Sequence, residues 1–270
     1  MKLKYLGTGA SEGFPGVFCQ CDACKRARAL GGKNLRRRFG SVVDDSILMD
    51  VSPDVFGSSL VQGVDLSRIA HIVVTHTHED HFYLHEFLNF SDPFAHRIDG
   101  PVVRLYGSVT VRDAFEAKFG DTLDHLVQMV TLEPFQPVRV GAHTVTAMPA
   151  SHGAGVSFIY LIESQGKTLL YAHDTGEFAE VVWQYLQGKH VDMVSMDCTS
   201  IIGADYDSHM TIGGNLRVRD RLLKMGCADE KTTFIAAHFS HNGLLMHEEI
   251  EERFAPHGVR VAYDGYEAQI

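Results

Sequence analysis

The densest group of chemically capable side chains is the segment from Thr75 to His81, THTHEDH in one-letter code. It holds four potential metal ligands within six positions: His76, His78, Asp80 and His81. On a strand, residues two positions apart point to the same side, so the first two histidines are expected to project together. Imidazole and carboxylate ligands suit Zn, Mn, Fe or Ni. A histidine-rich polar turn is the alternative, and four ligands directly after a buried strand argue against it.

The cysteines form a second candidate site. Three of the five lie close together, at Cys19, Cys21 and Cys24, a spacing that suits one tetrahedral zinc ion better than three independent core thiols. A redox pair or inert thiols are the alternatives. An odd number of cysteines with this spacing favours metal binding in a reducing compartment over a disulfide framework. Cys198 and Cys227 stand alone and are interpreted as small buried apolar side chains.

Hydrophobic periodicity predicts the elements that position these residues. Apolar runs predict strands at Lys2–Leu6, Ser46–Asp50, His71–Thr75, Val102–Tyr106, Val138–Met148, Val156–Glu163, Thr168–Tyr171, Val191–Met196 and Thr232–Ala236. Amphipathic patterns predict helices at Pro53–Gln62, Glu79–Asn89, Val109–Phe119, Glu177–Leu186, Ile212–Met225 and Leu244–Phe254. Residues 138–171 indicate successive antiparallel strands, whereas strand and helix alternate on either side. Helices packed outside two mixed sheets accommodate both patterns.

Composition narrows the class of protein. With 270 residues, 45% of them hydrophobic and 21% charged, the chain is long enough for one globular domain, residues 1–270, with a substantial core. No apolar run approaches about 20 residues and the N-terminus lacks a signal-peptide pattern, so we expect a cytoplasmic protein with no membrane partner. The net charge of −10 argues against a nucleic-acid partner, whereas 16 histidines supply abundant metal ligands.

The THTHEDH segment after an early strand resembles the metallo-β-lactamase fold family, and the match extends along nearly the whole chain. The resemblance implies an α/β four-layer αβ/βα sandwich, with two mixed sheets flanked by helices and a metal site at one edge. The family's third histidine, bridging aspartate and last histidine correspond to His152, Asp174 and His238, each just after an apolar run. By that pattern Asp174 bridges two ions, whose other ligands are His76, His78 and His152 for one and Asp80, His81 and His238 for the other.

Within this fold, the sequence is similar to a branch of phosphoribosyl cyclic phosphodiesterases in which three cysteines and a histidine hold a structural zinc. That zinc braces the N-terminal loop, here about residues 17–25. Its fourth ligand would be His241, because the nearby ligand His238 already brings the loop that contains His241 to the metal edge. In phosphodiesterases and RNA-processing relatives, a histidine in a late loop contacts the phosphate and protonates the leaving oxygen. We match that general acid to His209, for which a helix cap is the alternative.

These resemblances imply a metal-dependent hydrolase of phosphonate metabolism that cleaves a small cyclic phosphodiester such as phosphoribosyl 1,2-cyclic phosphate. Two divalent ions outweigh the charges of Asp80 and Asp174, so the acidic protein would present a positive pocket to this anionic partner. The ions would lower the pKa of a bound water while His209 assists departure of the sugar oxygen. Two alternatives stay open: a transfer-RNA 3′-processing endonuclease, and a non-catalytic accessory protein of cofactor biosynthesis. The analogy also implies a homodimer.

One basic stretch lies beside the predicted zinc loop and comprises Lys25, Arg26, Arg28, Lys33, Arg36, Arg37 and Arg38. Its positive charge would suit the phosphate or the sugar of the substrate. Alternatively, it is a solvated face that balances nearby acidic groups.

Overall fold

The computed structural model describes residues 1–96, 100–204 and 207–270. Within these residues the first sheet has seven strands in the order β14-β1-β2-β3-β4-β5-β6. Their bounds are β1 (Lys2–Gly7), β2 (Gly40–Val43), β3 (Ile47–Met49), β4 (His71–Val73), β5 (Val103–Gly107), β6 (Val127–Thr131) and β14 (Glu267–Gln269). The pairs from β14 to β3 are antiparallel and those from β3 to β6 are parallel, so the sheet is mixed.

The second sheet, over the same described ranges, has seven strands in the order β13-β12-β11-β10-β9-β8-β7. Their bounds are β7 (Pro137–Val140), β8 (His143–Pro149), β9 (Phe158–Ser164), β10 (Lys167–Ala172), β11 (Met193–Asp197), β12 (Thr233–Ala237) and β13 (Val259–Val261). β7 to β10 form the expected antiparallel meander, and β10 to β13 pair in parallel.

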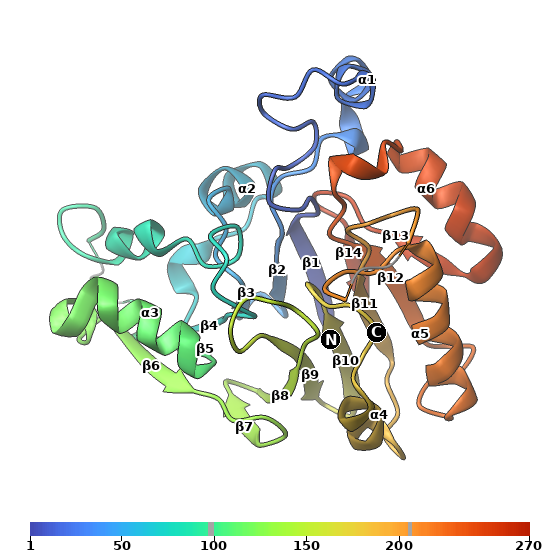
Figure 1. Cartoon of the computed structure of the whole chain (residues 1–270). Helices are drawn as coiled ribbons and strands as arrows, with labels where there is room; N and C mark the ends of the chain where they lie inside the picture. The colour runs from blue at the N-terminus through green and yellow to red at the C-terminus, as the bar shows by residue number, and fades with distance from the viewer. Residues whose placement is uncertain (97–99, 205–206) are drawn as a thin grey trace.

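Helices cover the outer faces of both sheets (Figure 1). Their bounds are α1 (Asp22–Leu30), α2 (Val55–Gln62), α3 (Val109–Phe119), α4 (Glu180–Leu186), α5 (Ile212–Lys224) and α6 (His247–Phe254). Side chains of α2 and α3 pack against the first sheet, and those of α4, α5 and α6 pack against the second. α1 lies on the N-terminal arm at the top of the view in Figure 1.

The strands are almost continuously apolar because both faces of each sheet are buried. On β10, Leu169 packs between the two sheets, and the next residue, Leu170, packs under the helices of the second sheet. On β4, Val73 lies between the sheets while Ile72 faces α2 and α3. This alternation makes three apolar layers from four layers of elements, and it confirms the four-layer αβ/βα sandwich.

Two sequence-based element assignments were wrong. The predicted strand Val138–Met148 is split into β7 and β8 by a tight turn in which Gly141 has a φ of 56°. The predicted helix Glu79–Asn89 is replaced by an irregular turn followed by a 3₁₀ segment, Leu84–Phe90. The helical ladder does not form there because backbone groups are bonded to the segment after β3: the Val51 N–H donates to the His81 carbonyl at 2.7 Å, and the Tyr83 N–H donates to the Val51 carbonyl at 2.8 Å.

Several elements were not anticipated by the apolar pattern, namely α1, β2, β6, β13 and β14. The short edge strand β14 is an example: it pairs with β1, so the two chain ends lie side by side in one sheet. Among the described residues, no helix is both long and apolar enough to cross a membrane.

Candidate metal centre

Loops after β4 and β8 bring three of the predicted ligands together. Nε2 of His76 lies 3.0 Å from Nδ1 of His78, and Nε2 of His152 lies 3.2 Å from that same Nδ1. The other ring nitrogen of His152 contacts the carbonyl oxygen of Ser208 at 3.3 Å. Because a carbonyl oxygen only accepts, Nδ1 of His152 carries the proton and Nε2 presents a lone pair to the shared space.

A second group is formed by Asp80, His81 and His238. The two Nε2 atoms of the histidines lie 3.1 Å apart, and Oδ2 of Asp80 is 3.4 Å from Nε2 of His81. Nδ1 of His81 donates to Oδ2 of Asp50 at 2.8 Å, and Nδ1 of His238 contacts the Thr199 hydroxyl at 2.6 Å. These partners fix the rings so that both Nε2 atoms face the same point, as is usual for metal-ligating histidines.

Asp174 lies between the two groups. Its Oδ2 is 2.7 Å from Nε2 of His81 and 3.0 Å from Nε2 of His238, while its Oδ1 is 4.0 Å from Nε2 of His152. Although Oδ2 is buried and has close neighbours, no hydrogen bond of acceptable geometry reaches it among the described residues. Burial raises the pKa of Asp174, but the neighbouring histidines outweigh burial and hold it well below its ordinary value.

The donor set fits a pair of metal ions. Ligands that lie about 2.0–2.1 Å from one tetrahedral ion are about 3.3 Å apart, close to the nitrogen separations observed here. An uncoordinated carboxylate oxygen buried among bare imidazole nitrogens is costly, and a cation between them removes that cost. Within the described chain, the residues that could hold ions include His76 with His78 and His152, Asp80 with His81 and His238, and Asp174 with His76 and His81.

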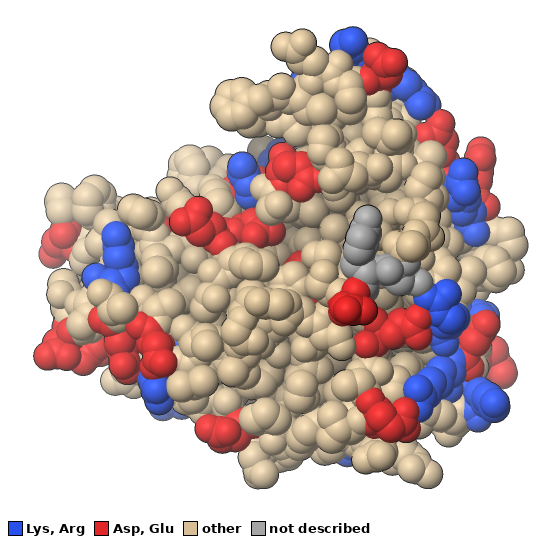
Figure 2. Space-filling view, viewed as in Figure 1, with Lys and Arg blue, Asp and Glu red and all other residues tan. Residues whose placement is uncertain are grey.

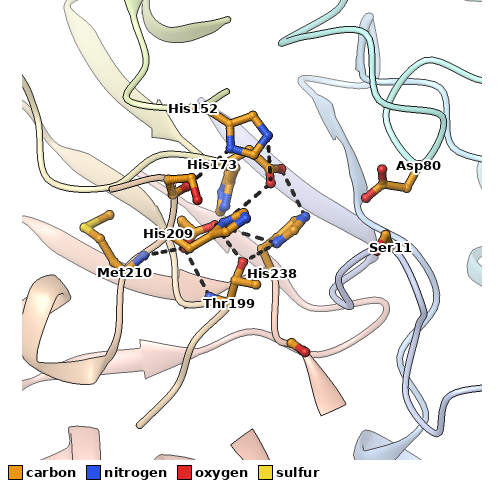
Figure 3. Close-up of polar contacts among 12 residues, drawn as sticks. Ser11, Asp80, His152, His173, Thr199, His209, Met210 and His238 are labelled. Carbon is orange, nitrogen blue, oxygen red and sulfur yellow. Dashed lines mark hydrogen bonds and ion pairs between the residues drawn. The ribbon is translucent and has the colours of Figure 1, made fainter. Parts of the chain in front are cut away.

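His209 lies beside His152 and His238 (Figure 3), with ring centroids 5.0 Å and 6.2 Å from theirs. Its Nδ1 is 3.2 Å from Oδ2 of Asp197 and 3.7 Å from Oδ1 of Asp174. Asp197 is fully buried at the end of β11 and also accepts from the Thr199 hydroxyl at 2.8 Å and the Met210 N–H at 2.9 Å. The carboxylate thus orients the predicted general acid while holding the threonine that contacts His238.

Three strand ends at this edge have left-handed backbone. Asp50, Asp174 and His238 have φ values of 62°, 48° and 61°, in the left-handed region that residues with a side chain seldom adopt. Each follows a buried strand directly or by one residue, and each is itself buried. Such conformations cost about 1–3 kcal/mol each and persist where surrounding contacts enforce them, typically at functional sites.

The four predicted zinc ligands also converge. The Sγ atoms of Cys19, Cys21 and Cys24 and a ring nitrogen of His241 lie within 4.8 Å of one another, with Nδ1 of His241 3.5 Å from Sγ of Cys24. The guanidinium of Arg28 donates to the Cys19 carbonyl at 2.9 Å and so ties α1 to the loop that carries the first thiol. Three thiolates and one imidazole are a common ligand set of structural zinc.

The fold and the clustered ligands find a parallel in known proteins. Residues 45–239, more than half of the chain, match the family described as the beta-lactamase superfamily domain. The chain belongs to the beta-lactamase superfamily. This confirms the resemblance on which the ligand assignment was based. Its two mixed sheets with helices on their outer faces are those of the metallo-β-lactamase fold.

Solved structures place this superfamily member among proteins of the same fold. A protein described as a new diphosphatase from the PhnP family aligns with a TM-score of 0.77 and 22% identity, over 99% of this chain and 97% of that one. Zn²⁺-bound PqqB from Methylobacterium extorquens aligns with a TM-score of 0.76 and 17% identity over 100% of both chains. The short form of human tRNase Z aligns with a TM-score of 0.67 and 17% identity, over 100% of this chain and 99% of that one.

A curated relative has a different name. An octanoyltransferase from Porphyromonas gingivalis is 24% identical over 279 aligned residues, which cover 100% of this chain and 52% of that protein. The chain therefore spans about half the length of the curated relative that it matches.

Some functional residues of this superfamily member were not identified from the sequence. Asp50, Asp197 and Thr199 contact the predicted ligands His81 and His238 or the predicted general acid His209 from remote positions. The sequence held one signal for Asp50. It directly follows the apolar run of β3, just as the predicted ligands follow the apolar runs of other strands. Thr199 had no comparable signal.

The basic stretch is engaged within the chain. Its members are ion-paired, stacked or bonded to carbonyls: Lys25 with Asp22, Arg26 with Glu249, Lys33 with Glu251, Arg37 with Asp264, Arg38 with Asp54, Arg28 with two carbonyl oxygens, and Arg36 with the rings of Phe14 and Phe239. Figure 2 shows basic side chains next to acidic ones at the top and along the right side of the face it displays. These contacts favour a face that balances acidic groups over direct contact with substrate.

Proposed function

We propose that this chain is a metal-dependent phosphodiesterase that hydrolyses a small cyclic phosphate ester, with phosphoribosyl 1,2-cyclic phosphate as the leading candidate. The observation that carries the proposal is the position of Asp174 between two three-ligand groups, with His209 directly beside it. Paired metal sites with a neighbouring proton donor suit hydrolysis of a phosphodiester, in which a nucleophile must be activated and a leaving oxygen protonated.

The proposed ligands are His76, His78 and His152 for one divalent ion, Asp80, His81 and His238 for the other, and Asp174 for both. A bound pair of Zn, Mn, Fe or Ni ions supplies an acidified water and offsets the charge of the phosphodiester. The protein's own contribution is to hold the ligand atoms in place through Asp50, Thr199 and the Ser208 carbonyl. A separate structural zinc is proposed at Cys19, Cys21, Cys24 and His241.

His209 is proposed as the general acid. Its Nδ1 is engaged by Asp197, which leaves Nε2 to deliver a proton to the departing oxygen. Asp197 accepts from Nδ1 and stabilises the charged ring, so the protonated form is available for this transfer. The side chain is 23% exposed, which is enough for contact with a substrate at the surface of the cluster.

A small substrate is favoured over a polynucleotide. The net charge of −10 repels an extended polyanion, and five of the seven residues of the basic stretch are ion-paired within the chain. The likeness to a diphosphatase and to a tRNase Z nevertheless defines the substrates that must be compared.

The test is steady-state turnover of the metal-reconstituted protein on a panel of substrates. The panel contains a phosphoribosyl cyclic phosphate, cyclic nucleotides, a diphosphate diester, bis(p-nitrophenyl) phosphate and a precursor transfer RNA, each with Zn, Mn, Fe or Ni. We expect the highest kcat/KM on the cyclic phosphoribosyl ester and loss of turnover in Asp174→Ala. Preferential cleavage of the precursor transfer RNA would reassign the function, and inactivity on every diester would overturn it.

A further inference from the structure

The two proposed metal centres share one short segment of chain, residues 238–241. His238 belongs to the group with Asp80 and His81, and His241 belongs to the group of cysteines. Since the two histidines are separated by only Phe239 and Ser240, the backbone of this segment sets the position of both ligands. His238 also has a left-handed φ of 61°, a conformation that must be enforced from outside.

The enforcing contacts come from the N-terminal segment 8–24, which runs alongside residues 238–241. The Thr8 carbonyl accepts from the Phe239 N–H at 2.9 Å, and the Ala10 N–H donates to the Phe239 carbonyl at 3.1 Å. Further along, the rings of Phe14 and Phe239 both lie against the buried guanidinium of Arg36. At its far end the segment supplies the three thiols that meet His241, so a metal there would clamp the two segments together.

Glu12 lies in the middle of this pairing. Its Oε1 accepts from the Ser240 hydroxyl at 2.6 Å and from the His241 N–H at 3.0 Å. Glu12, which belongs to the same N-terminal segment, therefore holds Ser240 and His241, the two residues that directly follow Phe239. Ser240 is also tied to the catalytic side, because its N–H donates to the Thr199 carbonyl at 3.2 Å, and the Thr199 hydroxyl contacts His238.

We propose that Glu12 is a positioning residue that couples the Cys–His centre to His238, so that filling one centre raises the metal affinity of the other. This inference rests on the metal sites of the proposed function. When the cysteine centre is filled, segment 8–24 is held against residues 238–241 and the strained His238 is kept in its ligating position. When that centre is empty or Glu12 is missing, the segment loosens and His238 relaxes. Such coupling is reciprocal: each bound metal raises the affinity of the other site by the same factor. Typical coupling free energies between two sites change affinity by about 5–150-fold.

The test measures metal binding by the full-length chain without substrate. Metal-free, reduced protein is titrated with Co²⁺, whose near-ultraviolet thiolate charge-transfer absorption reports the cysteine centre, while visible absorption and calorimetry report the histidine sites. The variants are Glu12→Ala, Glu12→Gln and Cys19→Ser, with Glu230→Ala as an exposed control, and circular dichroism checks that each is folded. Glutamine keeps the Oε1 acceptor, so Glu12→Gln serves as the conservative rescue.

We expect Glu12→Ala to develop the thiolate band but to bind the histidine-site ion about tenfold more weakly, with Glu12→Gln and Glu230→Ala close to the parent protein. We also expect His238→Ala to weaken Co²⁺ binding at the cysteine centre of the parent protein but not in the Glu12→Ala background. Histidine-site affinity at the parental value in both Glu12→Ala and Cys19→Ser would overturn the coupling. Because no turnover is measured, this outcome is independent of whether any diester is cleaved.

Discussion

Oδ2 of Asp50 lies 2.8 Å from Nδ1 of His81, although 31 positions separate the two residues and both are fully buried. The same carboxylate accepts from the N–H of Thr75 at 2.8 Å, at the start of the histidine-rich segment. One acidic side chain at the end of β3 thus fixes both the entry to that segment and the ring of its last histidine. Partners of this kind control the orientation and basicity of a metal ligand.

We therefore expect Asp50→Ala to weaken metal binding and to lower the proposed phosphodiesterase activity by about 10–100-fold, the usual effect of losing such a partner. Binding is measured by calorimetry with Zn²⁺ or Mn²⁺ and by metal analysis after dialysis. Asp44→Ala is a matched control, because Asp44 also has a left-handed φ, of 47°, and contacts a histidine, Nε2 of His143, at 2.8 Å. Asp44 precedes β3, whereas Asp50 follows it, so Asp44 lies at the end of the strands far from the candidate metal centre. Equal loss of metal affinity in both variants would contradict the role of Asp50.

The general-acid role of His209 predicts a dependence on the leaving group. His209→Gln should lower kcat by about 10²–10⁴-fold for an alkoxide leaving group, which needs a proton. The loss should be small for p-nitrophenolate, which departs without one. Rates are compared on a sugar cyclic phosphate and on bis(p-nitrophenyl) phosphate, with metal content checked in both proteins. An equal loss on the two substrates would indicate a role in binding or structure instead.

The environment of His209 also predicts a pH dependence. Burial lowers the pKa of His209, but the hydrogen bond and charge of Asp197, with the charge of Asp174, outweigh burial and raise it. An acid must be protonated to act, so the rate is expected to fall as the pH rises through this pKa. Asp197→Asn removes the negative charge, and the alkaline limb of the kcat profile should move to lower pH. A limb that stays in place would exclude His209 as the titrating acid.

The cysteine group predicts selective alkylation in metal-free protein. The N–H of Cys24 donates to Sγ of Cys21 at 3.4 Å and, as the largest cause, lowers the pKa of Cys21 to about 7, whereas burial raises the pKa of Cys24 to about 11. The thiolate is the reactive form and predominates above the pKa, so Cys21 is half ionised near pH 7 while Cys24 remains a thiol.

We expect iodoacetamide to label Cys21 much faster than Cys24 between pH 6 and 8, as measured by mass spectrometry of the digested protein. Added Zn²⁺ should protect both residues. Equal labelling rates, or labelling unaffected by zinc, would contradict this arrangement of the thiols.

Local spacing made part of the site predictable. His76, His78, Asp80 and His81 lie so close in sequence that any compact turn after a buried strand brings them near one point. The same holds for Cys19, Cys21 and Cys24, which need only a loop and the first turn of α1. The incorrect helix at Glu79–Asn89 shows the limit of this reasoning, because backbone groups of His81 and Tyr83 are bonded to Val51, which follows β3, and not to one another along a helix.

The partners of these ligands depended on the tertiary structure. Asp50 reaches His81, Thr199 reaches His238, and Glu12 reaches Ser240 and His241 across separations of 31, 39 and more than 200 positions. No periodicity encodes such contacts, because they arise only when the carboxyl ends of several strands meet at one edge. The left-handed backbone of Asp174 and His238 has the same origin, since neighbouring segments enforce it.

By itself, the sequence determined the ligand types, their local clusters and, through apolar runs buried on both faces, a layered α/β fold. The tertiary structure alone decided which acids and hydroxyls orient those ligands, and that five of the seven residues of the basic stretch are ion-paired within the chain. The physical reason is that ligand type and short-range spacing are properties of adjacent residues. Orientation and charge compensation, in contrast, are set by residues that are close only in space.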